Sequence, residues 1–471
     1  MITLNKVSFL YKGSEEKSLH EVSLRISKGQ CVLLCGVSGC GKTTITRLIN
    51  GLVPHFFEGD LSGEITVNGL DAKQADILKL SDIVGTVFQN PRTQFFNTDT
   101  DSEIVFGLEN RGLPSEVLSN RLERVNEELH TQNLCGRSIF ELSGGEKQKI
   151  AFASVYATSP DIFVLDEPSS NLDYHSINEL KSFIKKIKQQ GKTIVVAEHR
   201  LWYLMDIADR VIFMENGRLI RDMGINEFAA LSENEIENMG LRARSLSDIK
   251  LAKADMDSEK KVFEVSDLTV KIGNKTILDD VSFRVNGGEI VAITGENGAG
   301  KTTLARALCG LNGEIGMVSL GGETLSSKRR REGSYMVMQD VGHQLFTDSV
   351  DAECSLGVAK PIKENIDEVL TLLSLSKLKE KHPLSLSGGQ KQRLAVAVSM
   401  LCGKEILIFD EPTSGLDFDS MNEVGALIKR LAEEGKIIII ITHDREFIQM
   451  ICSRVMVLES GKIRNSFKED L

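Results

Sequence analysis

The sequence predicts two α/β units in tandem, and three observations lead to this fold class. Short motifs recur in the same order in the two halves of the 471-residue chain. Apolar runs such as CVLLC at 31–35 and IFVLD at 162–166 are bounded by turn residues, as expected of parallel strands that are buried on both faces. These runs alternate with helical stretches, which is the pattern of a sheet covered by helices. Each half is therefore expected to be an α/β unit with a β-rich N-terminal portion.

The composition excludes several other classes. Hydrophobic residues make up 41% and charged residues 26% of the chain, which is typical of globular proteins. No apolar stretch approaches the ~18–20 residues of a membrane helix, and the N-terminus lacks the signal-peptide pattern, so we expect no membrane crossing. The net charge of −11 disfavours a general nucleic-acid binder. Eight cysteines without a CxxC pair are expected to be reduced thiols.

Three motifs carry the internal repeat. GVSGCGKTT at 36–44 returns as GENGAGKTT at 295–303, LSGGEKQ at 142–148 as LSGGQKQ at 386–392, and FVLDEPSSNLD at 163–173 as LIFDEPTSGLD at 407–417. A repeat whose period is about half the chain indicates two related structural units rather than a solenoid of short repeats.

The spacing of the copies identifies a rigid part of each unit. Lys42 and Lys301 are 259 positions apart. Three later pairs are each 244 apart: Ser143 and Ser387, Asp166 and Asp410, His199 and His443. The 15-residue difference therefore lies between the glycine loop and LSGG. A constant block beside a variable one predicts a rigid core with an adjustable subdomain.

The domain boundaries follow from the repeat. We expect a first domain over residues 1–230 and a second over 261–471, where VFEVSDLTV echoes ITLNKVSFL of the N-terminus. The segment 231–260 has mixed charge, no proline and some helical spacing, so it is expected to be a partly helical connector.

The pattern GxxxxGK[ST] occurs at 36–43 and 295–302, each time after an expected strand and before an expected helix. Glycines in such a loop let backbone N–H groups face phosphate oxygens, and the helix N-terminus adds positive potential. Lys42 and Lys301 are expected to reach the outer phosphates of a nucleotide. The hydroxyls of Thr43 and Thr302 are expected to contact Mg²⁺.

An acidic pair follows a buried strand in each half, at 166–167 and 410–411. Asp166 and Asp410 are expected to hold Mg²⁺ at the ends of their strands. Glu167 and Glu411 are expected to orient and deprotonate the attacking water, an effect worth about 10²–10⁴ in rate.

His199 and His443 end the next apolar strands, at an unchanged offset. A lone histidine is more often structural, but this paired recurrence predicts that both sense the γ-phosphate. The other six histidines show no such recurrence and are expected to be structural.

Together with Gln89 in VFQNP and Gln339 in VMQDV, these motifs resemble those of the ABC-type ATPases. The resemblance covers essentially the whole chain, and an LSGG segment between a glycine loop and a DE strand is highly specific to that family. It implies two tandem P-loop NTPase domains, each with a RecA-like α/β core, an N-terminal antiparallel β portion and a helical signature subdomain. It also implies ATP and Mg²⁺ as ligands.

The resemblance further implies that the two domains pair head to tail, so that each ATP lies between one domain's loop and the other's signature. Asp173 and Asp417 would bridge the halves, and the catalytic residues would be Glu167, Glu411, His199 and His443. Mg²⁺ would be held by Thr43, Gln89, Asp166, Thr302, Gln339 and Asp410. The nucleotide would be bound by Tyr11, Gly36, Ser38, Gly39, Gly41, Lys42, Thr43, Thr44, Gln89, Ser143, Gly144, Gly145, Gly295, Asn297, Gly298, Gly300, Lys301, Thr302, Thr303, Gln339, Ser387, Gly388 and Gly389.

Three differences between the two halves bear on these sites. Tyr11 matches the family's adenine-stacking aromatic, but Ile272 occupies the aligned position, so we expect weaker ATP binding at the second site. Glu146 stands where Gln390 follows LSGG, and we assign no consequence to that exchange. Cys40 in the first glycine loop is expected to be a small spacer rather than a redox-sensitive thiol.

Within the family, the segments after Gln89 and Gln339 look like the NPxxQxF…EIAFG stretch of energy-coupling-factor ATPases. AEHRL at 197–201 points the same way. That branch resembles vitamin and transition-metal uptake systems, in which two ATPase domains grip a transmembrane coupling protein and a separate small membrane protein captures the substrate. We therefore expect a peripheral protein at the cytoplasmic face of the membrane that binds no nucleic acid. The candidate docking residues are Phe95, Phe96, Leu345 and Phe346.

Two alternatives remain open within the family. Tandem ATPases of sugar importers have a similar length, but their second half often loses catalytic residues, whereas Glu411 and His443 are present here. Soluble ribosome-associated ABC ATPases often have a long basic connector. The segment 231–260 instead carries seven acidic and five basic residues.

Overall fold

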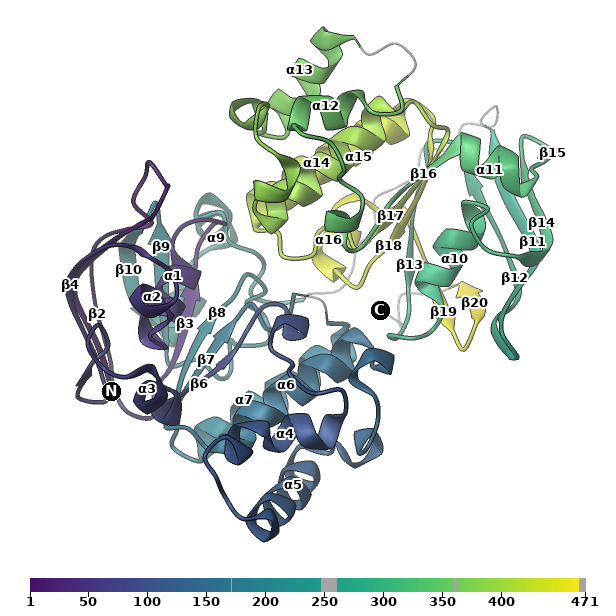
Figure 1. Ribbon diagram of the computed structural model, residues 1–471. Coiled ribbons are helices and arrows are strands. Elements are labelled where there is room, and N and C mark those ends of the chain that lie inside the picture. Colours follow the sequence, from purple (N-terminus) through teal and green to yellow (C-terminus); the bar gives the residue numbers. More distant parts are fainter. Residues whose placement is uncertain (171, 247–260, 359–361, 466–471) are drawn as a thin grey trace. The chain divides into compact units, whose positions relative to one another are not determined.

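The computed structural model describes residues 1–170, 172–246, 261–358 and 362–465. The chain divides into two compact units, Met1–Ser245 and Leu246–Leu471 (Figure 1). Each unit contains a six-stranded sheet, a four-stranded antiparallel sheet and a set of helices, so both halves have the α/β architecture that the sequence predicts.

The six-stranded sheet of unit 1 has the order β10-β9-β3-β8-β7-β6. All neighbouring strands are parallel except β10, which pairs with β9 in the antiparallel direction. Its strands are β3 (Cys31–Cys35), β6 (Val84–Val87), β7 (Ile162–Asp166), β8 (Thr193–Ala197), β9 (Arg210–Glu215) and β10 (Arg218–Gly224). The register pairs Asp166 with Ala197, so the acidic pair and His199 meet at one edge of the sheet.

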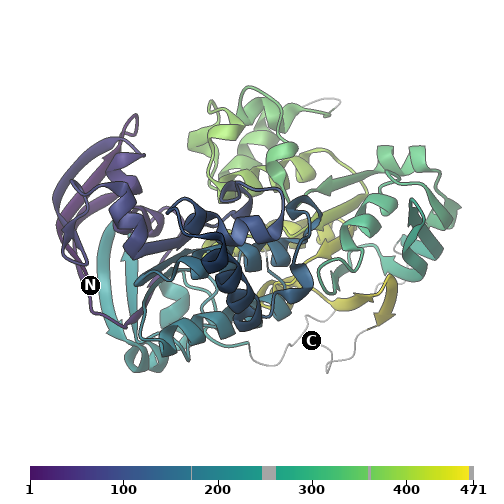
Figure 2. The same ribbon diagram turned by 60° about the horizontal axis from the view of Figure 1, so that its bottom comes forward.

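The antiparallel sheet of unit 1 has the order β2-β1-β4-β5. It consists of β1 (Ile2–Tyr11), β2 (Leu19–Ile26), β4 (Gly59–Val67) and β5 (Leu70–Asp71). The helices are α1 (Lys42–Ile49), α2 (Leu52–His55), α3 (Ile77–Ile83), α4 (Thr100–Glu109), α5 (Ser115–Leu129), α6 (Gly144–Thr158), α7 (Tyr174–Gln189), α8 (Ile225–Ala230) and α9 (Glu233–Asn238). Helices α4 and α5 lie away from the antiparallel sheet in both views (Figures 1 and 2).

Strand β3 is apolar throughout because it faces two hydrophobic cores. Cys31, Leu33 and Cys35 point into a core shared with α6 and α7. Val32 and Leu34 point into a second core shared with α1 and the antiparallel sheet. Side chains of successive strand residues point to opposite faces, so a strand covered on both faces has no polar position.

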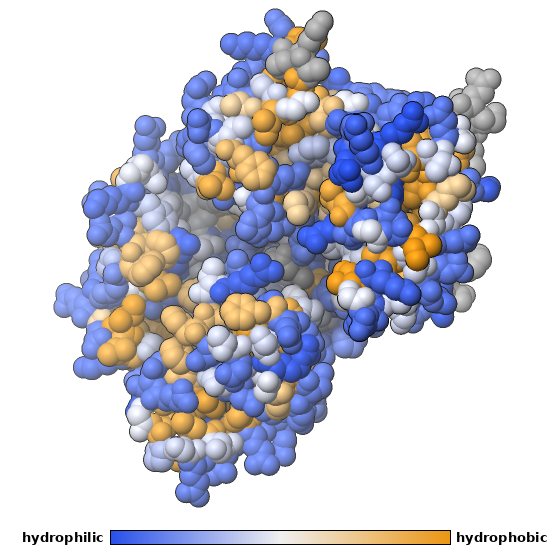
Figure 3. All heavy atoms as spheres, turned by 45° about the vertical axis from the view of Figure 1, so that its right-hand side comes forward, coloured by the Kyte–Doolittle hydropathy of each residue, from blue (hydrophilic) through white to orange (hydrophobic). Residues whose placement is uncertain are grey.

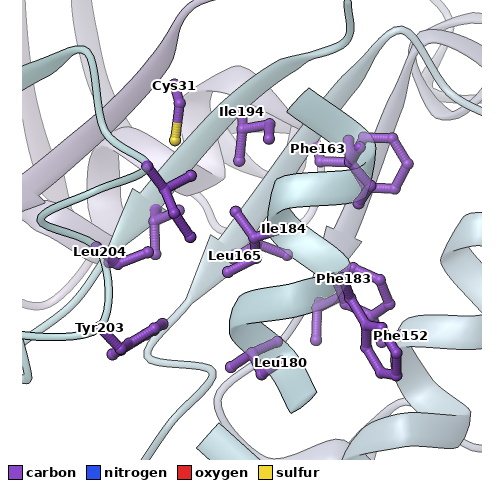
Figure 4. Packing of buried hydrophobic residues seen from close by; sticks show 14 of the residues in the cluster. Cys31, Phe152, Phe163, Leu165, Leu180, Phe183, Ile184, Ile194, Tyr203 and Leu204 are labelled. Atoms are coloured by element: carbon purple, nitrogen blue, oxygen red, sulfur yellow. The ribbon is translucent and has the colours of Figure 1, made fainter. Parts of the chain in front are cut away.

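Figure 4 shows the first of these cores at close range. Leu165 of β7 and Ile194 of β8 face the helix α7, which contributes Leu180, Phe183 and Ile184. The rings of Phe152 and Phe183 stack, with their centroids 5.3 Å apart. This packing fixes β7 and β8, and therefore the residues at their C-terminal ends.

Unit 2 repeats this architecture. Its six-stranded sheet, in the order β16-β17-β18-β13-β19-β20, contains β13 (Ile290–Thr294), β16 (Ser334–Val337), β17 (Ile406–Asp410), β18 (Ile437–Ile441), β19 (Arg454–Glu459) and β20 (Lys462–Asn465). Its antiparallel sheet, in the order β12-β11-β14-β15, contains β11 (Val262–Ile272), β12 (Lys275–Asn286), β14 (Glu314–Leu320) and β15 (Glu323–Thr324). The helices are α10 (Lys301–Leu308), α11 (Ser327–Gly333), α12 (Val350–Ser355), α13 (Lys363–Leu372), α14 (Gly388–Leu401), α15 (Phe418–Glu433) and α16 (Arg445–Ile451).

The expected connector, residues 231–260, is only partly described. The structure places its first part, up to Ser245, in unit 1. Ile236 of α9 and Leu241 are buried in the core of that unit, and Arg244 donates hydrogen bonds to the carbonyl oxygens of Phe228 and Ala229. Residues 247–260 lie outside the described part of the chain.

The surface is mixed in character. In Figure 3, hydrophobic side chains form small patches separated by hydrophilic ones on the face shown. Among the helices of the described residues, none combines the length and the apolar character that a membrane span requires.

Candidate functional site

The glycine loop of unit 1 joins β3 to α1 and has a backbone that glycine alone accommodates at Gly36. That residue has φ 144°, and an added Cβ would lie 2.1 Å from the carbonyl oxygen of Met214. Gly295 of unit 2 has φ 142° and an added Cβ would lie equally close to the carbonyl oxygen of Leu458. Each loop thus passes directly against the neighbouring strand. Ser38 and Gly39 follow in the turn of the first loop, and Asn297 and Gly298 follow in the turn of the second.

Both loop lysines fold back over their own loops. Lys42 Nζ donates to the carbonyl oxygens of Gly36 (2.8 Å) and Val37 (3.1 Å). Lys301 Nζ donates to those of Gly295 (2.6 Å) and Glu296 (2.9 Å). These carbonyl oxygens accept hydrogen bonds from the ammonium groups, so each positive charge is held beside its own loop.

A threonine–aspartate pair joins the end of each glycine loop to the C-terminal end of a non-adjacent strand of the sheet, β7 in unit 1 and β17 in unit 2. Thr43 Oγ1 lies 3.2 Å from Asp166 Oδ1, and Thr302 Oγ1 lies 2.9 Å from Asp410 Oδ2. Burial, together with the charge of Glu167, raises the pKa of Asp166 to about 6. Burial also raises the pKa of Asp410.

These two pairs fit a hard divalent cation. Hydroxyl and carboxylate oxygens are the ligands that Mg²⁺ prefers, and a bound cation would offset the cost of ionising a buried carboxyl. Thr43 with Asp166, and Thr302 with Asp410, are therefore the residues that would hold Mg²⁺ in the two units.

The two candidate bases have an unusual backbone. Glu167 and Glu411 adopt φ angles of 44° and 52°, in the left-handed region that non-glycine residues rarely occupy. Their N–H groups donate to the carbonyl oxygens of Ala197 and Ile441, each at 2.8 Å. Strain of this kind persists where the surroundings over-determine it and often accompanies function.

Each candidate base lies beside its histidine. His199 Nε2 is 3.4 Å from Glu167 Oε1, and His443 Nε2 is 3.7 Å from Glu411 Oε1. The Nε2 atom of His199 is buried and makes no hydrogen bond within the described part of the chain. A buried polar nitrogen without a hydrogen bond suits a ligand oxygen as its partner.

The units differ in what donates to the base. In unit 1, Gln89 Nε2 donates to Glu167 Oε2 at 2.6 Å. In unit 2, Thr442 Oγ1 donates to Glu411 Oε2 at 3.0 Å. Sequence reasoning missed Thr442, although its signal was present: the 244-residue offset aligns Thr442 with Glu198, a change from hydroxyl to carboxylate beside the histidine.

Tyr11, the last residue of β1, lies against the start of α1. Its hydroxyl is 3.3 Å from Thr44 Oγ1 and accepts a hydrogen bond from Arg47 Nη1 at 2.9 Å. The edge of the Tyr11 ring also packs near Phe57, with the ring centroids 6.3 Å apart. Ile272 in turn ends β11 and is exposed.

The signature serines begin long helices. Ser143 caps α6 in a capping box with Glu146, and Ser387 caps α14 in the same way with Gln390. Glu146 and Gln390 therefore both complete a capping box at the start of their helix. Glu146 also forms an ion pair with Arg137 at 2.9 Å. Their helix starts present the glycines that follow, Gly144, Gly145, Gly388 and Gly389. Asp173 and Asp417 cap α7 and α15.

The expected docking residues separate into two groups. Phe96 and Phe346 are 76% and 75% exposed. The expectation was wrong for Leu345, which is buried in the core of unit 2, and Phe95 packs against the core of unit 1. Phe95 and Leu345 thus anchor their two loops, and the residue that follows each of them, Phe96 or Phe346, is exposed.

Cys40 is buried against the glycine loop, and burial raises the pKa of its thiol. Its sulfur lies 3.7 Å from Lys42 Nζ. This environment fits the expected spacer.

A family model described as "ABC transporter" matches residues 19–170 and 278–414, one segment in each unit. The chain belongs to the ABC transporter family. A relative from Treponema denticola, provisionally named an ABC transporter ATP-binding protein, is 68% identical over 98% of this chain and 96% of its own length. A relative of the same provisional name from Methanosarcina mazei is 33% identical over 100% of this chain and 97% of its own length. The expected family is thereby confirmed.

Solved structures support the fold. A chain titled as a model of ribosome-bound archaeal Pelota and ABCE1 matches with a TM-score of 0.71 and 22% identity, over 98% of this ABC chain and 78% of that one. A structure titled RNase-L Inhibitor matches with a TM-score of 0.67 and 22% identity, over 98% and 89% of the two chains. The chain therefore has the tandem ABC ATPase fold, whose domains in general bind and hydrolyse ATP with Mg²⁺.

Proposed function

We propose that this ABC ATPase is the motor subunit of an importer of the energy-coupling-factor type, which drives uptake of a vitamin or a transition metal through separate membrane proteins. The observation that carries the ATPase part is the repeated constellation of glycine loop, Thr–Asp pair, glutamate and histidine. The proposal of a membrane partner rests on the exposed Phe96 and Phe346 and on the sequence around them.

The glycine loops would bind the phosphates of ATP through their backbone N–H groups. Lys42 and Lys301 would exchange the carbonyl oxygens they now contact for phosphate oxygens, which form stronger charge-assisted hydrogen bonds. Mg²⁺, when bound by the Thr–Asp pairs and, on the family resemblance, by Gln89 and Gln339, would neutralise charge on the outer phosphates.

The glutamates would act on the attacking water. Glu167 and Glu411 would accept its proton, a step that contributes about 10²–10⁴ in rate. His199 and His443 would contact the γ-phosphate through Nε2. On the family resemblance, each ATP would also meet the signature of the other unit, so that hydrolysis would release one half from the other.

The exposed phenylalanines are suited to a protein partner. Each stands on a loop tied to a buried carboxylate: Glu103 accepts from the N–H groups of Phe96 and Asn97, and Glu353 accepts from those of Phe346 and Thr347. A rigidly held exposed aromatic residue loses little conformational entropy on binding, which favours a hot spot of an interface.

The base assignment is tested with Glu167→Gln and Glu411→Gln together in the full chain. ATP should still bind, measured by filter retention of radiolabelled ATP, while phosphate release should fall by at least 100-fold. Normal hydrolysis by the double variant would show that neither glutamate is the base.

The branch of the family is tested by affinity purification from detergent-solubilised membranes of the source organism. The wild-type chain should recover membrane-spanning proteins together with a small bound solute that mass spectrometry identifies. Phe96→Ser with Phe346→Ser should lose them, while Phe56→Ser, at another exposed phenylalanine, should retain them. Recovery of ribosomes instead would favour the ribosome-associated alternative.

A further inference from the structure

The residue before the histidine differs in chemistry between two otherwise matched sites. Glu198 stands there in unit 1 and Thr442 in unit 2, each directly after the last residue of its strand, β8 or β18. Both side chains are buried, with 2% and 0% exposure. The neighbouring aspartate, glutamate and histidine are the same in the two units. This exchange is therefore a local difference between the two sites.

Glu198 in unit 1 is occupied by four donors. Its Oε1 accepts from the backbone N–H groups of His199 (2.8 Å) and Arg200 (3.1 Å). Its Oε2 accepts from the hydroxyl of Tyr203 (2.8 Å) and the N–H of Ser169 (3.3 Å). Both carboxylate oxygens of Glu198 therefore already accept hydrogen bonds from residues other than Glu167.

Arg200 completes this arrangement. Its Nη1 donates to the carbonyl oxygens of Ser169 and Leu172, each at 3.2 Å. The segment around His199 is thus joined to the loop after Glu167 by hydrogen bonds of both kinds. Glu198 accepts from that loop, and Arg200 donates to it. These contacts fix the backbone of His199, while Gln89 donates to the side chain of Glu167.

Thr442 in unit 2 is connected to the base itself. Its hydroxyl donates to Glu411 Oε2 at 3.0 Å and accepts from the N–H of Asp444 at 3.1 Å. Asp444 in turn accepts from the hydroxyl of Thr413 at 2.8 Å. A hydroxyl has one hydrogen, and Thr442 directs it to the carboxylate of Glu411.

We propose that Thr442 is a positioning residue for Glu411, a role that unit 1 assigns to Gln89 because both oxygens of Glu198 already accept from other donors. The inference rests on the proposed role of Glu411 as a base. In unit 2 the base is held by the residue that directly follows the core strand β18. In unit 1 it is held from the exposed loop after β6 that leads to Phe96. The two sites therefore orient the same carboxylate by different parts of the fold.

The proposal is tested in the full chain with Thr442→Val, which keeps the shape and removes the hydroxyl, and with Thr442→Ser, which restores it. Thr413→Val is the matched control, because it makes the same change at a neighbouring hydroxyl that donates to Asp444 rather than to Glu411. Steady-state kcat and KM for Mg-ATP are measured for each, with thermal unfolding to confirm folding.

Because unit 1 keeps its own base, Thr442→Val should lower kcat by about a third to a half with KM within 2-fold, and Thr442→Ser should return kcat to within about 10% of wild type. Thr413→Val should keep kcat within about 10% of wild type. A smaller loss in Thr442→Val, a loss that Thr442→Ser does not repair, or an equal loss in Thr413→Val would overturn the proposal. Hydrolysis that survives Glu167→Gln with Glu411→Gln would instead refute the proposed base, so the two failures are distinguishable.

Discussion

Single side chains in this protein show how buried charge is stabilised by its neighbours. Burial and the neighbouring charge of Glu167 disfavour the ionised form of Asp166 and raise its pKa to about 6. Glu128 on α5 shows the opposite shift. Burial would raise its pKa, but hydrogen bonds from Tyr156 and Arg124 and the charges of Lys186 and Arg124 outweigh burial and lower the pKa from 4.5 to about 2.

A depressed pKa makes stability depend on pH with a defined sign. The contribution of Glu128 is complete above its unfolded pKa near 4.5 and is lost as pH falls toward about 2. Glu128→Gln should lower the free energy of unfolding at pH 7 by about 1–2 kcal/mol, after allowance for solvent screening. Urea titrations at pH 7, 5 and 4 should show the difference from wild type narrowing at pH 4. The exposed neighbour Glu127→Gln is the control, and an unchanged difference across pH would contradict the assignment.

At the scale of elements, two loops are held by buried carboxylates whose role is not evident from the local sequence. Glu103 lies in the first turn of α4 and is buried, although its position would suit an exposed helix residue. It accepts from the N–H groups of Phe96 (3.0 Å) and Asn97 (2.8 Å), so α4 carries the loop before it. Glu353 of α12 repeats this contact with Phe346 (2.9 Å).

Removal of this acceptor should loosen one loop and leave the unit folded. A buried donor that loses its partner costs about 1–3 kcal/mol, so Glu103→Ala should open the loop at Phe96 more often. Limited digestion with chymotrypsin should cleave after Phe96 at least 5-fold faster than in wild type. Glu103→Gln keeps an acceptor oxygen and should stay within about 2-fold. Equal cleavage of all three chains would show that Glu103 does not hold the loop.

At the scale of the molecule, the chain contains two sets of hydrophobic cores. The two clusters around β3 take their residues from unit 1, and the two around β13 take theirs from unit 2. Chains built from separate cores depart from a single two-state transition, because each core unfolds with its own cooperativity.

Core truncations should therefore act on one unit at a time. Phe163→Ala in β7 removes a buried ring and should cost unit 1 about 3–5 kcal/mol. Differential scanning calorimetry should show two transitions, of which one moves by several degrees. Phe409→Ala in β17 is the matched change and should move the other. A single transition shifted alike by both variants would show that the two units unfold as one.

Much of the site could be predicted because its motifs are short and local. A glycine loop, a strand ending in Asp–Glu and a strand ending in His are contiguous segments, and the register of parallel strands brings their ends to one edge of the sheet. The pairing of Thr43 with Asp166, and of His199 with Glu167, agrees with that logic.

The remaining features depend on contacts between residues that are distant in sequence. Leu345 and Phe346 are adjacent apolar residues, yet one is buried and the other exposed, because packing against α14 and the neighbouring helices selects one face of the loop. Repeat spacing was sufficient to predict two related units, and the motifs in their order carried the resemblance to ABC ATPases, since both are properties of order along the chain. Whether a threonine or a glutamine donates to the base depends on side-chain positions in three dimensions, where Glu411 meets Thr442 and Glu167 meets Gln89.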